Sequence, residues 1–274
     1  MITVFQLALS VISGVVVGFS LGLIGGGGSI LAVPLLLYFV GLDTLPNSAH
    51  IAIGTTALAV GVNAYINSYM HLKKKNVAPR IGIIFAGVGL IGSLIGAFLG
   101  RITPGGDLLT YFAIAMIVLG IYMAIRKESS SAGSIQEVDR VLQAKTGCKK
   151  ITRSLFAKVG GFGFVVGLLS GYFGIGGGFL IVPSLMFSSG LCITRAIGTS
   201  LLSVGTFGVA SGLEYTAYGE TILSIALMYI LGGAAGGYAG TSLAVKAPKK
   251  ELRLVYGAVI VLVGIYMLLR VHGI

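Results

Sequence analysis

The chain has 274 residues, of which 55% are hydrophobic and only 10% are charged. Soluble domains carry about 25% charged residues, so this composition excludes an ordinary soluble enzyme and predicts a membrane protein with several spans. The Lys and Arg behind the formal net charge of +11 fall mostly in a few short loops, which favours a role in membrane orientation over nucleic-acid binding.

Ten apolar segments follow one another along the chain. They cover roughly residues 4–24, 30–40, 51–69, 81–100 and 108–125, and then 155–173, 179–188, 196–211, 222–244 and 252–269. A helix needs about 20 apolar residues to cross the hydrocarbon core, so we predict an all-α polytopic membrane protein. A polar linker separates the two sets, and a short amphipathic helix is expected in it near residues 135–142. The first apolar run lacks the features of a cleaved signal peptide and is expected to be retained.

The second set of segments repeats the first. At a constant offset of 149 residues, Gly25 aligns with Gly174 and Pro34 with Pro183. Later in each half the offset is 144, so the sequence AIGTTALAVG from Ala52 aligns with AIGTSLLSVG from Ala196. We therefore predict an N-terminal membrane repeat at 1–126, a cytoplasmic linker at 127–154 and a C-terminal membrane repeat at 155–274.

The distribution of cations predicts that the two repeats are inverted relative to each other. The loop HLKKKNVAPR at 71–80 is strongly basic, whereas its counterpart GLEYTAYGE at 212–220 has no Lys or Arg. The next pair reverses, with one cation in RITPGGD at 101–107 and four in KAPKKELR at 246–253. Because cytoplasmic loops are enriched in Lys and Arg, the linker is predicted inside and both termini outside.

Two glycine clusters interrupt the apolar segments, GGGGS at 25–29 and GIGGG at 174–178. The apolar run 30–40 that follows the first would make only about 16 Å of helix, too short for a full crossing. Non-helical backbone at membrane depth must face protein or water, and paired broken helices mark substrate sites in transporters with inverted repeats. A helix that starts just after the glycines would direct backbone N–H groups towards an anion. The alternative is that the glycines serve only tight packing. Neither cluster has the Lys-Ser or Lys-Thr of a phosphate loop.

Glycines also recur at four-residue spacing within the longer segments, and these are typical of close helix packing. One example is the run Gly14, Gly18 and Gly22.

Paired hydroxyl residues follow a glycine in the third segment of each half. Thr55 and Thr56 align with Thr199 and Ser200. Such hydroxyls can bind substrate oxygens, but they equally often bond to the helix backbone or to a neighbouring helix. The sequence alone is consistent with both roles, substrate binding and hydrogen bonding to helices.

Other polar residues in the apolar segments carry weaker signals. Asn63 and Asn67 lie one helical turn apart without a counterpart in the second half, and we expect them to make an interhelix hydrogen bond. His50 and Arg195 stand at the start of the third segment of each half, where they could gate or couple transport or lie at the membrane interface.

No Asp or Glu lies deep in an apolar segment, and Asp43, Asp107, Glu214 and Glu220 are all expected in outer loops. A carboxylate relay of the proton-pump kind is therefore not predicted, and proton coupling would depend on His50 or on the substrate itself.

The two cysteines, Cys148 and Cys192, form no metal-binding pattern and are interpreted as free thiols. No cofactor, metal or enzymatic activity is predicted.

The motifs GGGGSILAVP and GIGGGFLIVP, together with AIGTT and AIGTS, resemble those of the TauE/SafE family of sulfite and organosulfonate permeases. The resemblance covers nearly the whole chain and carries its motif positions onto Gly25, Gly27, Gly28 and Pro34, and onto their repeat counterparts. It implies a secondary transporter for a small sulfur-containing anion, which we expect to work by alternating access; a passive anion channel is the alternative.

The implied location is the inner membrane of a prokaryote, with the bilayer, the anion, a coupling proton and a second copy of the chain as candidate partners. The candidate substrate-binding residues are Gly25, Gly26, Gly27, Gly28, Ser29, Thr55, Thr56, Gly174, Gly176, Gly177, Gly178, Thr199 and Ser200, with His50, Arg195, Pro34 and Pro183 as candidates for gating or coupling.

Overall fold

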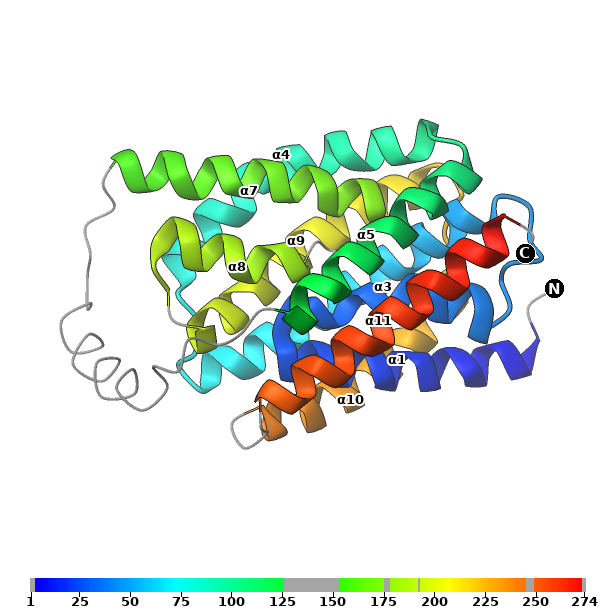
Figure 1. Cartoon of the computed structure of the whole chain (residues 1–274), viewed down its shortest axis with the longest axis horizontal. Helices are drawn as coiled ribbons and strands as arrows, with labels where there is room; N and C mark the ends of the chain where they lie inside the picture. The colour runs from blue at the N-terminus through cyan, green and yellow to red at the C-terminus, as the bar shows by residue number, and fades with distance from the viewer. Residues whose placement is uncertain (1–2, 126–152, 175–177, 192, 245–248, 273–274) are drawn as a thin grey trace.

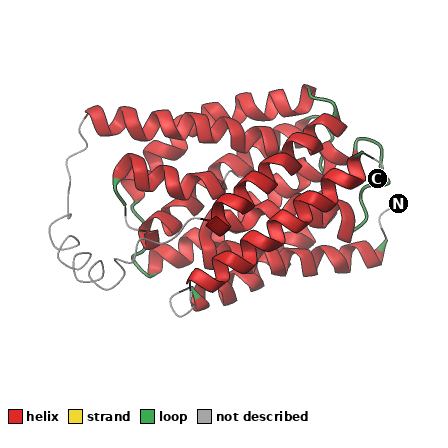
Figure 2. Cartoon of the chain, viewed as in Figure 1, coloured by secondary structure: helices red, strands yellow, loops and turns green. Residues whose placement is uncertain are grey.

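A computed structural model describes residues 3–125, 153–174, 178–191, 193–244 and 249–272. These residues form helices joined by short loops, with no strand among them (Figure 2). In chain order the elements are α1 (Val4–Ile24), the 3-10 helix η1 (Gly25–Leu31), α2 (Ala32–Pro34), the π-helix η2 (Leu35–Phe39), α3 (Ser48–Lys73), α4 (Pro79–Ile102), α5 (Gly105–Ile125), α7 (Arg153–Phe173), α8 (Gly178–Ser189), α9 (Ile193–Ala217), α10 (Leu223–Leu243) and α11 (Lys249–Val271). All ten predicted segments coincide with helical structure. The predicted amphipathic helix, Cys148 and Cys192 lie outside the described residues.

Membrane-spanning capacity is confirmed by length and composition. Within the described ranges, six helical stretches are long and apolar enough to cross a bilayer, and the run from Val4 to Phe39 counts as one of them. The protein is therefore an all-α polytopic membrane protein.

Helices α3 and α9 form the centre of the molecule. In their most apolar stretches 72% and 67% of residues are buried, against 39–50% in the other four spans. Gly61 packs against Gly208, while Gly212, one turn further along α9, packs against Leu58 on the preceding turn of α3. The two helices thus run antiparallel, crossing where small residues bring the backbones close.

Three further helix pairs surround this centre: α1 with α10, α4 with α7, and α5 with α11 (Figure 1). When each helix is replaced by its counterpart in the repeat, the pairing is unchanged, because α1 corresponds to α7, α4 to α10 and α5 to α11. Each outer pair therefore joins one helix from each half. Such interlocking agrees with a duplication, while the opposite orientation of the halves in the membrane stays a prediction from charge.

The glycines at four-residue spacing make these close pairs. A methyl group at Gly18 would lie 2.1 Å from the carbonyl oxygen of Gly233 on α10, and one at Gly167 would lie 2.1 Å from the carbonyl oxygen of Gly89 on α4. No side chain fits between backbones at that distance. The packing role predicted for these glycines is confirmed.

Helix α1 begins and helix α11 ends at the same end of the bundle (Figure 1). We call this end the terminal end. Here the start of α1 meets the loop after η2, because the Gln6 side-chain amide donates to the Gly41 carbonyl at 3.4 Å. There Asp43 also forms an ion pair of 2.6 Å with Arg270 near the end of α11. At the opposite, basic-loop end, Lys74 donates to the Thr241 carbonyl at 2.8 Å.

Two acidic residues differ from their predicted places. Helix α9 continues beyond the expected end of the apolar segment to Ala217, so Glu214 lies in its last turn and not in a loop. Asp107 lies in the first turn of α5, where the partial positive charge of a helix N-terminus favours a carboxylate. The loop assignment was wrong because it ended each helix where the apolar run ends, whereas a helix can continue while its polar residues face loops and solvent.

Candidate functional site

The first glycine cluster turns the chain back onto α1. Gly25 has φ of 81°, a left-handed conformation that favours glycine, and its N–H donates to the Leu21 carbonyl. A methyl group at Gly28 would lie 2.3 Å from the carbonyl carbon of Ser20 and 2.4 Å from the Leu21 nitrogen. The chain therefore reverses at Gly25 and returns in direct backbone contact with the helix it has left.

This returning segment is helical, although not regularly so. We predicted non-helical backbone at 25–29, but a 3-10 helix begins at Gly25, and every residue from Gly25 to Leu31 is buried. A single α-turn containing Pro34 follows, and then the π-helix Leu35–Phe39. Because Pro34 has no N–H to donate, a change of helical pitch at this point is physically reasonable. The prediction of irregular backbone was wrong, while the break in the long helix is present.

Hydroxyl groups of α9 meet the turn in the protein interior. The Gly26 N–H donates to the Ser200 Oγ over a long 3.4 Å, and the Ser29 Oγ donates to the Gly26 carbonyl at 2.8 Å. Ser203 lies one helical turn beyond Ser200, is fully buried, and has no hydrogen-bond partner at its Oγ. The first candidate half-site is therefore a buried group of backbone amides and serine hydroxyls, in which Ser200 donates to the Ile197 carbonyl at 2.7 Å and the Ser203 hydroxyl has no partner.

At the second glycine cluster, Gly174 lies against α3. Gly174 has φ of 63°, and a methyl group there would lie 2.2 Å from the Ile53 Cγ2. The counterpart of Ser200 is Thr56, whose hydroxyl donates to the Ala52 carbonyl at 2.7 Å. Gly176 and Gly177 lie outside the described residues, and Gly178 begins α8.

Gly25 and Gly174 lie near opposite ends of the central helix pair, α3 and α9. Gly25 contacts Ile197, about 6 Å into α9 at 1.5 Å per residue, and Gly174 contacts Ile53, at a similar depth in α3. Because α3 and α9 are antiparallel, these contacts lie on opposite sides of the crossing at Gly61. The arrangement is two half-sites at different depths, joined along α3 and α9.

Thr55 and Thr199 make matching contacts between the halves. The Thr55 Oγ1 accepts a hydrogen bond of 3.0 Å from the N–H of Ile222, which precedes α10. The Thr199 Oγ1 accepts one of 2.9 Å from the N–H of Ala78, which precedes α4. Both hydroxyls thus bind backbone groups at a helix start in the other half of the chain.

The candidate gating residues are dispersed. His50 is buried at the terminal end, with its Nε2 3.1 Å from the Thr103 carbonyl at the end of α4. Arg195 is half-buried in the first turn of α9, near the basic-loop end. Pro34 is buried after η1, and Pro183 is half-buried inside α8.

Asn63 and Asn67 connect α3 to α10, as predicted. The Asn63 amide donates to the Tyr229 carbonyl at 3.4 Å, and the Thr241 hydroxyl donates to the Asn67 Oδ1 at 3.1 Å. One turn further along the same face, the His71 Nε2 lies 3.2 Å from the Gly22 carbonyl. This contact of His71 was not predicted, although the four-residue spacing from Asn67 places both side chains on one face of the helix.

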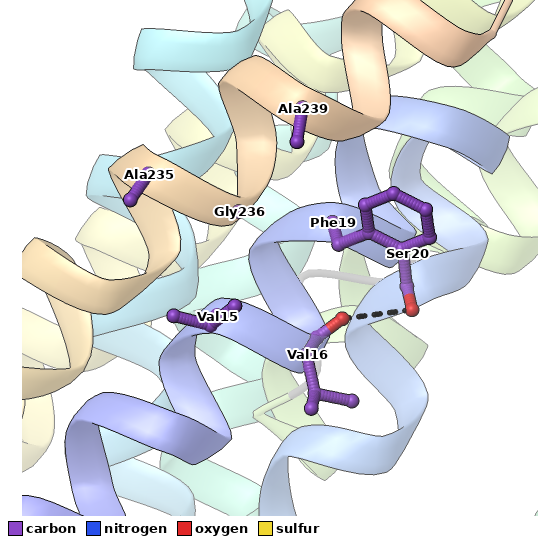
Figure 3. A pocket seen from close by; sticks show the side chains of 7 residues that line it. All are labelled: Val15, Val16, Phe19, Ser20, Ala235, Gly236 and Ala239. Atoms are coloured by element: carbon purple, nitrogen blue, oxygen red, sulfur yellow. Dashed lines mark hydrogen bonds between the residues drawn. The ribbon is translucent and has the colours of Figure 1, made fainter.

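A pocket of about 370 Å³ lies between α1 and α10 (Figure 3). Its lining is formed by Val15, Val16, Phe19, Ser20, Ala235, Gly236 and Ala239. The single hydroxyl, on Ser20, already donates to the Val16 carbonyl at 2.9 Å. This apolar pocket, whose one hydroxyl is already bonded, offers no free side-chain donor to a small anion.

Comparison with known proteins identifies the family. The protein-family model described as sulfite exporter TauE/SafE matches residues 10–267. The chain belongs to the TauE/SafE family. In this TauE/SafE chain, the motif GGGGSILAVP is the hairpin that folds back onto α1.

Similar proteins cover nearly the whole of this TauE/SafE chain. A "Probable membrane transporter protein" of Xylella fastidiosa (strain 9a5c) is 41% identical over 270 residues, which are 98% of this chain and 97% of that protein. YunE of Bacillus subtilis (strain 168), with the same description, is 28% identical over 258 residues, covering 93% and 94%. MJ0441 of Methanocaldococcus jannaschii is 26% identical over 273 residues, covering 96% of each chain. No solved structure matches. The family and these names indicate a membrane transporter and not an enzyme.

Proposed function

We propose that the protein is a secondary transporter of a small sulfur-containing anion, such as sulfite or an organosulfonate, in the inner membrane of a prokaryote. The observation that carries this proposal is the buried turn at Gly25–Ser29, where the Gly26 amide meets the Ser200 hydroxyl one helical turn from the buried, unpartnered hydroxyl of Ser203. Uncharged donors of this kind bind an anion without a permanent counter-ion, so the anion can also be released. The family description supports the sulfur oxyanion as the chemical class.

Alternating access is the mechanism we propose for this transporter. Every residue of η1 is buried, so the half-site is closed to both ends of the molecule in this conformation. Opening to one end requires movement of the re-entrant hairpin relative to α9, for which Gly25 and the pitch change after Pro34 are natural pivots. A passive channel would need no such movement, and saturable counterflow distinguishes the two.

A ligand screen on purified protein tests the substrate class. A bound ligand stabilises the folded state, by about 2.7 kcal/mol at 100 times its Kd. We expect sulfite, thiosulfate, sulfoacetate or taurine to raise the Tm saturably, and chloride to have no effect. Stabilisation by none of the sulfur anions, or equal stabilisation by chloride, contradicts the proposal.

A matched pair of serine variants tests the location. Ser203 has no hydrogen bond to lose, so Ser203→Ala should keep the wild-type Tm while weakening the ligand response about fivefold or more. Ser13→Ala is the control, because Ser13 is equally buried but donates only to the Leu9 carbonyl of its own helix. An unchanged ligand response in Ser203→Ala places the site elsewhere.

A further inference from the structure

A group of buried polar atoms lies at the terminal end, where α4 and α9 finish and the loop to α10 begins. Five side chains there each have a buried polar atom without a hydrogen-bond partner: the Nε of Arg101, the Oε2 of Glu214, the hydroxyl of Tyr215, the Oε2 of Glu220 and the Oγ1 of Thr221. Buried polar atoms are nearly always paired, so several unpaired ones in one place need an explanation. We call these five residues the terminal-end cluster.

The members of the cluster surround Tyr215. Its side chain is fully buried, and the charges of Glu220, Glu214 and Arg101 all act on its hydroxyl. A methyl group at Gly54 would lie 2.6 Å from the Tyr215 Cβ and 2.9 Å from the Thr221 Oγ1. One at Gly100 of α4 would lie 3.0 Å from the Tyr215 hydroxyl, so the cluster extends along the length of the Tyr215 side chain between α3 and α4.

Arg101 is held in place without being neutralised. Its Cζ lies 3.4 Å from the centre of the Tyr218 ring, and that ring is 55% exposed at the molecular surface. Stacking on an aromatic face orients a guanidinium group while its N–H groups remain free in the plane. The charges of Arg101 and Glu214 interact, yet the ion pair that the described residues form at this end is between Asp43 and Arg270. Arg101 thus keeps an unused donor close to an unused carboxylate oxygen.

We propose that the terminal-end cluster binds the transported oxyanion together with a proton carried by Glu214. This inference rests on the proposed function, and it assigns an anion-recognition site that is distinct from the glycine half-sites. Arg101 and Tyr215 supply N–H and O–H donors for the oxyanion. Glu214 repels an anion while ionised and becomes a further donor when protonated. Binding of the proton therefore strengthens binding of the oxyanion, and binding of the oxyanion strengthens binding of the proton to the same extent.

The reason for choosing Glu214 is its position. It lies in the last turn of α9, and its charge interacts with that of Arg101, whereas Glu220 follows in the loop. The other titratable or charged groups that face this locus are Arg101 from α4, Tyr172 from α7, Tyr215, Tyr218 and Glu220 from α9 and its loop, and His50 from α3. His50 bonds to the end of α4 beside this locus, so the test must separate it from Glu214.

The probe is ethanesulfonate, because its charge stays at −1 between pH 5.5 and 7.5 and any pH dependence then belongs to the protein. Binding is measured calorimetrically on the full chain in detergent, and uptake is measured in proteoliposomes. For wild type we expect about tenfold weaker binding at pH 7.5 than at pH 5.5, as coupling to one proton implies. Glu214→Gln should bind about equally at both pH values, near the wild-type affinity at pH 5.5. His50→Gln should keep the wild-type pH dependence.

Two further variants test the donors. Arg101→Lys keeps the charge but loses the planar fork, and we expect about tenfold weaker binding at pH 5.5. Tyr215→Phe removes a hydroxyl that has no partner in the structure, so it should weaken binding about fivefold without lowering the Tm. That combination distinguishes a ligand contact from a structural role.

The outcomes separate this inference from the proposed function. Wild-type binding and uptake with unchanged pH dependence in Glu214→Gln, or with unchanged affinity in Arg101→Lys and Tyr215→Phe, overturn the site alone. Absence of ethanesulfonate binding and of sulfur-anion uptake in wild type overturns the proposed function and the site with it.

Discussion

The Thr55 hydroxyl accepts a hydrogen bond of 3.0 Å from the backbone N–H of Ile222, at the start of a helix in the other half of the chain. Its repeat counterpart Thr199 does the same for Ala78. Since the first N–H groups of a helix have no partner within it, these two threonines stabilise helix starts that the local sequence leaves uncapped.

Replacing either threonine with valine should destabilise the fold by about 1–2 kcal/mol, the usual cost of a lost cap in a buried setting. Valine keeps the shape, so the loss reports the hydrogen bond. Thermal unfolding in detergent measures it. Thr216→Val is the control, because Thr216 donates only to the Gly212 carbonyl in its own helix, and its Tm should change little. Equal Tm values for Thr55→Val and Thr216→Val would show that the contact between the halves is unimportant.

Two neighbouring glycines of the first cluster should respond differently to alanine. At Gly28 a methyl group would meet the Ser20 backbone at 2.3 Å, whereas at Gly27 its nearest contact is the Ile24 Cγ2 at an ordinary 3.5 Å. Gly28→Ala should therefore cost several kcal/mol, or prevent folding, since the backbone must move. Gly27→Ala should stay within about 1 kcal/mol of wild type. Size-exclusion profiles and Tm values check both variants, and a Gly28→Ala protein as stable as Gly27→Ala would contradict the hairpin geometry.

The contact between Asn67 and Gly237 allows a double-mutant cycle. A methyl group at Gly237 would lie 2.5 Å from both Asn67 amide atoms, and its three nearest atoms all belong to that side chain. Each alanine variant alone should be destabilising. The double variant Asn67→Ala/Gly237→Ala should be more stable than the sum of the two single changes predicts, by about 0.5–3 kcal/mol. Additive changes would mean that the two residues are not in contact.

Membrane orientation can be tested with single cysteines on a background that lacks Cys148 and Cys192. Asp107 and Lys73 are both exposed, at the terminal end and the basic-loop end respectively. The positive-inside rule predicts that Asp107→Cys reacts with an impermeant maleimide in intact cells, and that Lys73→Cys reacts only after permeabilisation. The reverse pattern would invert the topology.

Much of the fold was predictable because it depends on local patterns. Apolar length determined the helices, and α1 begins and ends at the predicted residues, Val4 and Ile24. The first glycine cluster predicted a break in the helix, and the helix ends at Gly25, which has a positive φ. The interhelix role of Asn63 and Asn67 followed from two amides one helical turn apart in an apolar segment.

The candidate site was less predictable, because it depends on contacts between the two halves. Nothing local to Thr55 shows that Ile222 will lie against it, and nothing near Ser200 shows that Gly26 will meet it. The terminal-end cluster was missed for a related reason. The segment around Glu214 reads as a polar loop, and only the packing of α9 against α4 turns it into a partly buried group beside Arg101.

The central claim is that this protein moves sulfur oxyanions by alternating access. Counterflow in proteoliposomes tests it most directly: vesicles loaded with unlabelled sulfite or ethanesulfonate are diluted into a trace of the labelled anion. A carrier that alternates must exchange one for the other, so we predict a transient accumulation of label that saturates with concentration and is weakened in Ser203→Ala, which keeps the wild-type Tm. Uptake that shows no accumulation and no saturation would identify a channel, and no uptake of either anion would contradict the account.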